Sequence, residues 1–214
     1  MQVINKQKLK DKVFASLQDA ILSGSLRVGE RIVETQVALN LGVSQATIRE
    51  ALKDLEHFGL VEKKPYQGTY VKQLDKKELR DAYDARMVLE VYTAEMAAKC
   101  ISQEQLETIR ELMRGMSMAA AAGDAKTFSD YNVRFHEAII DSCGNKMVKK
   151  LWHLANVSLW TLVATNVSKR TLNNLAARHI NIMRALENRD PDGARVAIQA
   201  HLVELRDEMI GSIK

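Results

Sequence analysis

The sequence predicts a mostly α-helical chain, in which an N-terminal winged helix-turn-helix is followed by an all-α bundle of six helices. Three observations support this prediction. Proline occurs only twice in 214 residues and aromatic residues make up 5%, while alanine, leucine and methionine are abundant. Two short β-patterned segments lie on either side of residues 65–67. Every segment after residue 74 has helical periodicity, so we expect domains at residues 1–73 and 74–214.

The N-terminal part begins with a helical pattern from Lys6 to Ser23, and a turn is expected from Leu26 to Arg31. A short helix is predicted from Glu34 to Leu41. Gly42 then permits a tight turn into a third helix, which begins at Ser44 and ends at Gly59. Three helices followed by a β-hairpin predict a helix-turn-helix with a wing.

The third helix is amphipathic in a way that suits DNA recognition. The residues expected in the core are Ala46, Ile48, Ala51, Leu52 and Leu55. The residues expected on the exposed face are Ser44, Gln45, Thr47, Arg49 and Lys53. Glutamine can pair with the edge of adenine, arginine with guanine or phosphate, and the hydroxyls with phosphate. We therefore expect this helix to lie in the major groove of double-stranded DNA.

Further DNA contacts are predicted outside this helix. Arg31 and Lys64, together with Lys53, are candidates for phosphate contacts, and Thr35 is another candidate. Gln67-Gly68 at the tip of the wing is expected to reach the minor groove. Residues 1–74 carry 11 Lys/Arg against 8 Asp/Glu, a balance of +3, whereas residues 75–214 carry 20 against 19, a balance of +1. The excess of positive charge therefore lies in the part expected to bind DNA.

Capping residues and helix breakers divide the second part into six helical segments. Asp75 and Glu78 form a candidate capping box for the first, which runs to about Lys99. The others are predicted at residues 102–123, 124–144, 145–167, 169–188 and from Asp190 onward, with Pro191 at the first helical position. Because the connections are short, neighbouring helices should pack antiparallel.

Four polar residues of this bundle form a candidate metal site. Asn132 and His136 are one turn apart on the same face of the third segment. His179 lies midway along the fifth segment and His201 lies in the sixth. Three imidazoles and a side-chain oxygen could converge on a divalent metal. A lone helical histidine is more often a hydrogen-bonded core residue, so spacing alone leaves both readings open.

Composition excludes several classes of protein. A hydrophobic content of 46% and a charged content of 27% are those of an ordinary globular chain, and no apolar stretch reaches the roughly 18 residues that span a bilayer. The N-terminus has no signal-peptide core, so we expect a cytoplasmic protein without a membrane partner. Cys100 and Cys143 have no motif spacing and are expected to be free, buried thiols.

With these elements in order, the chain resembles the GntR family of bacterial transcription regulators, in the FadR-type branch with an all-helical FCD effector domain. In the N-terminal part, the resemblance rests on residues 21–26, 29–31, 41–44, 47–52, 59–61 and 68–71. In the second part it rests on Arg86 with Glu90, Phe135-His136, Gly144-Asn145, His179 and Ala200-His201. Six C-terminal helices rather than seven are similar to the VanR-type subgroup.

The resemblance implies a homodimeric regulator, not an enzyme, bound to a palindromic operator and controlled by a small carboxylate effector. It implies that Asn132, His136, His179 and His201 hold a divalent metal, zinc first, with nickel, manganese or iron as alternatives. Arg86 matches an arginine that can face the effector, where it would form a fork for a carboxylate. The alternative for Arg86 is a salt bridge to Glu90 one turn on.

Two residues depart from the family pattern. Gln45 stands where the family often has arginine, so the preferred base there should change from guanine towards adenine. Asn132 stands where the family frequently has aspartate. A neutral amide brings an oxygen but no charge, so we expect a lower metal affinity, or an effector carboxylate that supplies the missing charge.

Two other functions are weighed against this one. A helical-bundle metalloenzyme would need a general base, yet the candidate ligand set has no spare carboxylate, and the sequence has no nucleophile elbow, phosphate loop or Glu-x-x-His pair. An architectural DNA binder without an effector would have a fully packed second domain.

Overall fold

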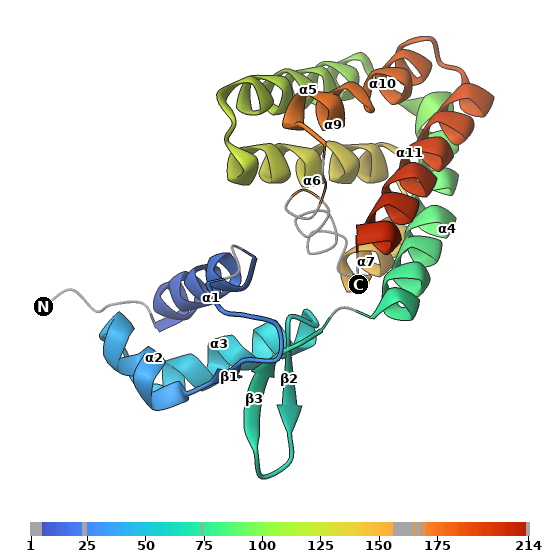
Figure 1. Cartoon of the computed structure of the whole chain (residues 1–214). Helices are drawn as coiled ribbons and strands as arrows, with labels where there is room; N and C mark the ends of the chain where they lie inside the picture. Colours follow the sequence, from blue (N-terminus) through green and yellow to red (C-terminus); the bar gives the residue numbers. More distant parts are fainter. Residues whose placement is uncertain are drawn as a thin grey trace, which may run out of the picture. The chain divides into compact units, whose positions relative to one another are not determined.

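The computed structural model of the chain describes residues 6–22, 25–73, 75–155, 165, 168 and 170–212. The chain forms two compact units, Met1–Leu74 and Asp75–Lys214, and each is described by itself (Figure 1). Among the described helices, none combines the length and the apolar character needed to cross a membrane.

The N-terminal unit has three helices and a small antiparallel sheet. Its elements are α1 (Lys6–Leu22), β1 (Arg31–Ile32), α2 (Glu34–Leu41), α3 (Gln45–His57), β2 (Val61–Lys64) and β3 (Gly68–Val71). The predicted helices and hairpin are confirmed. Gly42 ends α2 with φ of 64°, a left-handed conformation that costs glycine little and that turns the chain into α3.

The predicted turn that ends at Arg31 is wrong at its last residue. Arg31 and Ile32 form β1, which pairs with β3, so β3 is the central strand in the order β1-β3-β2. Before the strand, Gly29 N donates to Val71 O and Val71 N donates to Glu30 O, both at 2.9 Å. β1 therefore holds β3 on the side opposite β2. With only two residues, β1 is too short to show the alternating pattern that predicts a strand.

Among its described residues, the C-terminal unit has helices and connecting turns and no strand. Its elements are α4 (Lys76–Cys100), α5 (Gln103–Ala122), α6 (Ala125–Ser142), α7 (Lys146–Leu154), α9 (Leu172–Ala177), α10 (Ile180–Glu187) and α11 (Pro191–Ser212). The long helices α4 and α11 pack along each other, and α5 packs against α6 (Figure 1). The predicted limits at Val167 and Lys169 lie outside the described residues.

The helix starts follow the predicted caps with one change. Asp75 caps α4 by accepting from Lys77 N at 3.2 Å, whereas the reciprocal capping box forms at α5, between Ser102 and Gln105. The single helix predicted at residues 169–188 is wrong: α9 ends at Ala177 and α10 begins at Ile180. His179 is therefore not midway along a helix but at the break between two, and it precedes the first residue of α10.

Both cysteines are free, as predicted, but the prediction that they are buried is wrong. Cys100 is exposed at the end of α4, and Cys143 is half-buried just after α6. Both residues lie at helix ends, where the apolar core gives way to connecting backbone.

Candidate nucleic-acid interface and metal centre

The start of α3 is fixed by a cap. Ser44 accepts a hydrogen bond from Thr47 N at 3.2 Å, and the hydroxyls of Ser44 and Thr47 lie 2.8 Å apart. Thr47 is only 4% exposed, while Ala46 is exposed, so the predicted positions of these two residues are exchanged. Thr47 can be buried because its hydroxyl has a partner within the turn. It is not part of the outward face.

Removing the cap should destabilise the start of α3. We expect Ser44→Ala to destabilise the N-terminal unit by about 1 kcal/mol, because Thr47 N loses its acceptor and the buried hydroxyl of Thr47 loses its neighbour. Urea denaturation followed by circular dichroism measures this. Ser44→Asp, which keeps a capping acceptor, should restore the stability, and an unchanged Ser44→Ala protein would contradict the role of the cap.

The outward face of α3 carries Gln45, Arg49 and Lys53, with Ser44 at its start, and all four are exposed. Arg49 Nε donates to Glu34 Oε2 of α2 at 2.7 Å, and the Arg49 side chain stays 62% exposed. Sequence reasoning missed Glu34, since the two residues are 15 positions apart and nothing local links them. The pair therefore links α3 to α2 while most of the Arg49 side chain stays exposed.

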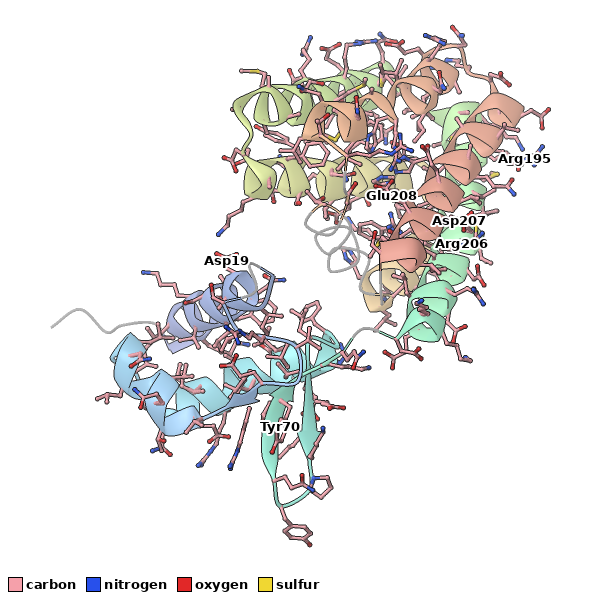
Figure 2. The ribbon with its side chains drawn as sticks, in the orientation of Figure 1. Asp19, Tyr70, Arg195, Arg206, Asp207 and Glu208 are labelled. Carbon is pink, nitrogen blue, oxygen red and sulfur yellow. The ribbon has the colours of Figure 1, made fainter. Side chains whose placement is uncertain are left out.

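The remaining predicted DNA contacts are distributed over the wing and the start of α2. Thr35 and Gln67 are exposed, and Arg31 lies on β1 with its Nε 3.1 Å from where a Cβ on Gly68 would be. Lys64 pairs with Glu62 at 3.0 Å and lies over the ring of Tyr70, which Figure 2 labels on the wing. Lys64 and Gln67 therefore lie on the hairpin, Arg31 on the strand paired with it, and Thr35 in the first turn of α2.

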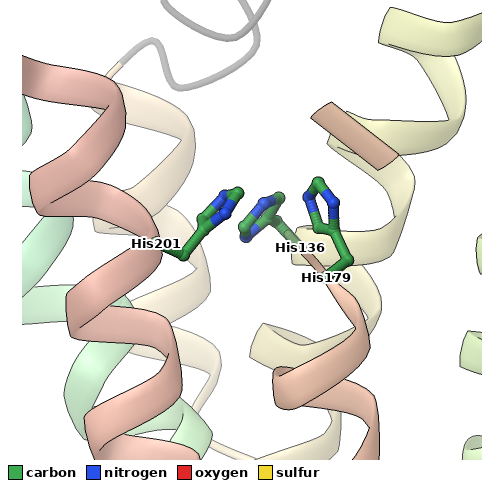
Figure 3. A group of neighbouring side chains, drawn as sticks. All are labelled: His136, His179 and His201. Carbon is green, nitrogen blue, oxygen red and sulfur yellow. The ribbon is translucent and has the colours of Figure 1, made fainter. Parts of the chain in front are cut away.

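In the C-terminal unit, the structure brings the three predicted histidines together. His136 comes from α6, His179 from the break between α9 and α10, and His201 from α11 (Figure 3). One ring nitrogen of each lies within 4.8 Å of those of the other two, and all three residues are buried. Asn132 is buried beside them, with its Oδ1 3.1 Å from His179 Nε2. This is the donor set that the sequence predicts.

The hydrogen bonds of His179 fix which nitrogen is free. Its Nδ1 faces two backbone carbonyls, Leu175 O at 3.1 Å and Ala176 O at 3.2 Å, so Nδ1 must carry the proton and donate. Nε2 then presents a lone pair to the Asn132 oxygen, which is also an acceptor. A cation between these two atoms would satisfy both, and a carbonyl on the distal nitrogen is the usual support of a metal-ligating histidine.

The other two histidines are also short of partners. Among the described residues, neither His136 Nε2 nor either ring nitrogen of His201 has a hydrogen-bond partner, although all are buried. Buried polar atoms without partners are uncommon in native proteins. The three histidines and Asn132, with the arginines Arg86 and Arg178, line an inner cavity of about 10 Å³, room for one water-sized species. The three histidines and Asn132 fit a divalent metal.

The protonation state of the cluster also suits a metal. Burial, followed by the neighbouring His136, lowers the pKa of His179 to about 3, although the two carbonyls oppose this. Burial and the two other histidines lower the pKa of His201 well below its ordinary value. Both rings are therefore neutral at physiological pH, and neutral imidazole is the form that coordinates metals.

A buried carboxylate supports the site from α4. Glu90 Oε1 accepts from Arg86 Nε at 2.8 Å and from Trp152 Nε1 at 3.2 Å. Glu90 Oε2 lies 2.8 Å from His136 Nδ1, at an angle that departs from good hydrogen-bond geometry. Burial alone would raise the pKa of Glu90, but Arg86 and His136 outweigh it and lower the pKa to about 2. Sequence reasoning missed Trp152 and the contact with His136.

The alternative prediction for Arg86, a salt bridge to Glu90, is the one that the structure contains. Arg86 is 1% exposed, and its Nη1 has no hydrogen-bond partner among the described residues. Arg86 also lines the inner cavity, and its unpartnered Nη1 is not the nitrogen that forms the salt bridge, so the salt bridge does not exclude a contact between Nη1 and a carboxylate.

Comparison with known families assigns both units. Residues 9–71 match the family model described as bacterial regulatory proteins, gntR family, and residues 81–204 match the FCD domain. The chain belongs to the GntR family, in the branch with an FCD domain. The predicted family and fold class are therefore confirmed, and this GntR protein is related to transcription regulators rather than to enzymes.

Relatives cover almost the whole chain. A probable D-xylose utilization operon transcriptional repressor of Paenarthrobacter nicotinovorans is 29% identical over 94% of this chain and 91% of the relative. A gluconate operon transcriptional repressor of Bacillus licheniformis is 26% identical over 94% of this chain and 79% of the relative. A putative GntR regulator from Rhodococcus sp. RHA1 has the same fold, with a TM-score of 0.76, 21% identity and coverage of 96% and 99%.

Proposed function

We propose that this GntR regulator is a cytoplasmic homodimeric repressor that binds a palindromic operator and responds to a small carboxylate effector in a metal-containing FCD domain. The observation that carries the proposal is the convergence of His136, His179, His201 and Asn132, beside Arg86, around one buried cavity. A regulator whose second domain only joined two DNA-binding units would have no need of such a cluster.

The DNA side of the proposal rests on the exposed face of α3. Gln45 and Arg49 would read base edges in the major groove, with Ser44 and Lys53 on phosphates. Outside α3, the candidate contacts are Arg31, Thr35, Lys64, Gln67 and Gly68. A homodimer would present two such faces to two half-sites, so the operator should be palindromic.

The proposal of a carboxylate effector rests on the charge of the site. Imidazole nitrogens and an amide oxygen bring no negative charge to a bound metal, so a divalent metal, zinc first and nickel, manganese or iron next, would keep its positive charge. The metal would supply a Lewis-acidic site for an anion. The unpartnered Nη1 of Arg86 adds a donor suited to a carboxylate. The relative named for the gluconate operon makes gluconate, itself a carboxylate, a reasonable first compound to test.

Mutation of Arg49 tests the DNA side. We expect Arg49→Ala to weaken binding to the protein's own promoter fragment about 10- to 100-fold, since a cation that contacts a base or phosphate is lost. Mobility shifts over a range of salt concentrations measure this. Glu34→Ala is the matched control, because it removes the same ion pair but keeps the cation. Wild-type protein without any salt-dependent shift would contradict DNA binding.

An effector-free architectural role is the second candidate, and the small size of the inner cavity favours it. The structure, however, also has an outer pocket of about 470 Å³, lined by residues of the α9 region and α11 that include Arg178 and His201. Room for an organic acid therefore exists beside His201, which is one of the candidate ligands, and beside Arg178.

A further inference from the structure

Two cavities of very different size meet at the same side chains. The inner cavity, with its three histidines, measures about 10 Å³, which is too small for any organic acid. The outer pocket measures about 470 Å³. Arg178 and His201 line both, so these two residues form the wall between them. An effector that reaches the metal ligands from the outer pocket must displace part of this wall.

Only one of the three guanidinium nitrogens of Arg178 makes hydrogen bonds to the described residues. Its side chain is 7% exposed, and its Nη2 donates to Glu204 Oε1 at 3.0 Å and to Glu208 Oε2 at 2.7 Å on α11. Its Nε and Nη1 are buried and have no hydrogen-bond partner among the described residues. A buried guanidinium with two unused donors is costly, and an anion could occupy those donors.

The two carboxylates would not be stranded if Arg178 moved. Arg170 already reaches both, with Nη2 3.1 Å from Glu204 and Nε 3.3 Å from Glu208. Ser168 also donates to Glu208, which Figure 2 labels on α11. Because Arg170 still contacts both carboxylates, and Glu204 is 45% exposed, breaking the Arg178 contacts leaves no buried unpaired carboxylate, which would otherwise be the main cost of such a movement.

We propose that Arg178 binds an anion in the effector site and is also the movable part of the wall between the two cavities. It leaves Glu204 and Glu208 to take a carboxylate of the effector, and this movement joins the outer pocket to the inner cavity. Arg178 directly precedes His179 at the break between α9 and α10, so the movement acts on the candidate ligand next to it. The inference rests on the proposed metal and carboxylate effector and adds the residue that admits that effector.

Cobalt(II)-loaded protein tests the anion-binding part, with acetate as the probe and neutral acetamide as its control. Acetate should change the visible cobalt spectrum of the wild type, and its affinity should fall about tenfold or more in Arg178→Gln. Arg195→Gln is the matched control, since Arg195 is an arginine of α11 that is 43% exposed and lines neither cavity, and the acetate affinity of this variant should be unchanged. Arg178→Lys, which keeps the charge but not the fork, should fall between them.

Removal of zinc by EDTA tests the wall. Arg178→Ala should lose zinc about tenfold faster than the wild type, whereas Arg195→Ala, which changes an exposed arginine outside both cavities, should lose it at the wild-type rate. A purely structural arginine would not combine faster metal loss with weaker acetate binding. Equal acetate affinity in the wild type and Arg178→Gln would overturn the inference and leave the metal and DNA functions standing. Wild-type protein without bound cobalt would instead overturn the proposed metal and this inference together.

Discussion

Replacing Glu90 by glutamine is expected to destabilise the C-terminal unit by about 3–5 kcal/mol. Glu90 is 2% exposed and is the shared partner of Arg86, Trp152 and His136. Without its charge, the guanidinium of Arg86 remains buried without a counter-ion, and a buried uncompensated charge is among the most destabilising changes that a point mutation can make. Urea denaturation of the metal-free full-length protein measures the change.

Glu95→Gln is the matched control. Glu95 lies on the same helix and pairs with Lys99 at 2.7 Å over the same i,i+4 spacing, but at the surface, so its loss should change the stability little.

Acid titration gives a second test of the role of Glu90. The pKa of Glu90 is about 2 when folded against 4.5 when unfolded, so its stabilising contribution is complete above about pH 4.5 and is lost as the pH falls towards 2. The wild-type advantage over Glu90→Gln should shrink in that window. Equal stability of the two glutamine variants would show that Glu90 is not the central partner of the network.

The sequence predicted most of the N-terminal unit because its signals are local. Helical periodicity around Ile48 and Leu55, the left-handed turn at Gly42 and the hairpin before residue 72 each depend on a few neighbouring residues. Polarity alone did not predict that Thr47 is buried and Ala46 is exposed. Both residues border the apolar stripe, and only the hydroxyl of Ser44 makes burial of the threonine inexpensive.

The C-terminal unit shows where local signals end. No glycine or proline marks the break at Arg178-His179, so the pattern read as one continuous helix. The metal ligands were named through the family resemblance, since their spacing alone fits a core histidine equally well. The contact of Trp152 with Glu90 joins residues 62 positions apart, and that of Arg178 with Glu208 joins residues 30 apart. Both depend on how α4, α7 and α11 lie in the bundle, which no local pattern encodes.

The double substitution His136→Ala/His201→Ala is expected to abolish divalent metal binding. Each substitution removes one neutral nitrogen from a site of four neutral donors, and Asn132 with His179 alone cannot hold a metal against competing water. Metal content by mass spectrometry after dialysis against zinc measures this, and an anomalous scan on crystals locates the ion. His153→Ala is the matched control, because His153 is an exposed histidine paired with Glu137 at 3.3 Å. A double variant with full metal content would place the metal elsewhere.

Asn132→Asp then tests the charge of the site while it keeps the same set of ligand atoms. A carboxylate keeps the oxygen where His179 Nε2 meets it, at 3.1 Å in the present protein, and adds the negative charge that the site lacks. We expect zinc to bind at least about tenfold more tightly to this variant. The same added charge should weaken acetate binding to the loaded site, because the anion no longer completes an undercharged centre. Tighter zinc with weaker acetate would mean that the amide of Asn132 leaves the metal's charge for an effector to neutralise.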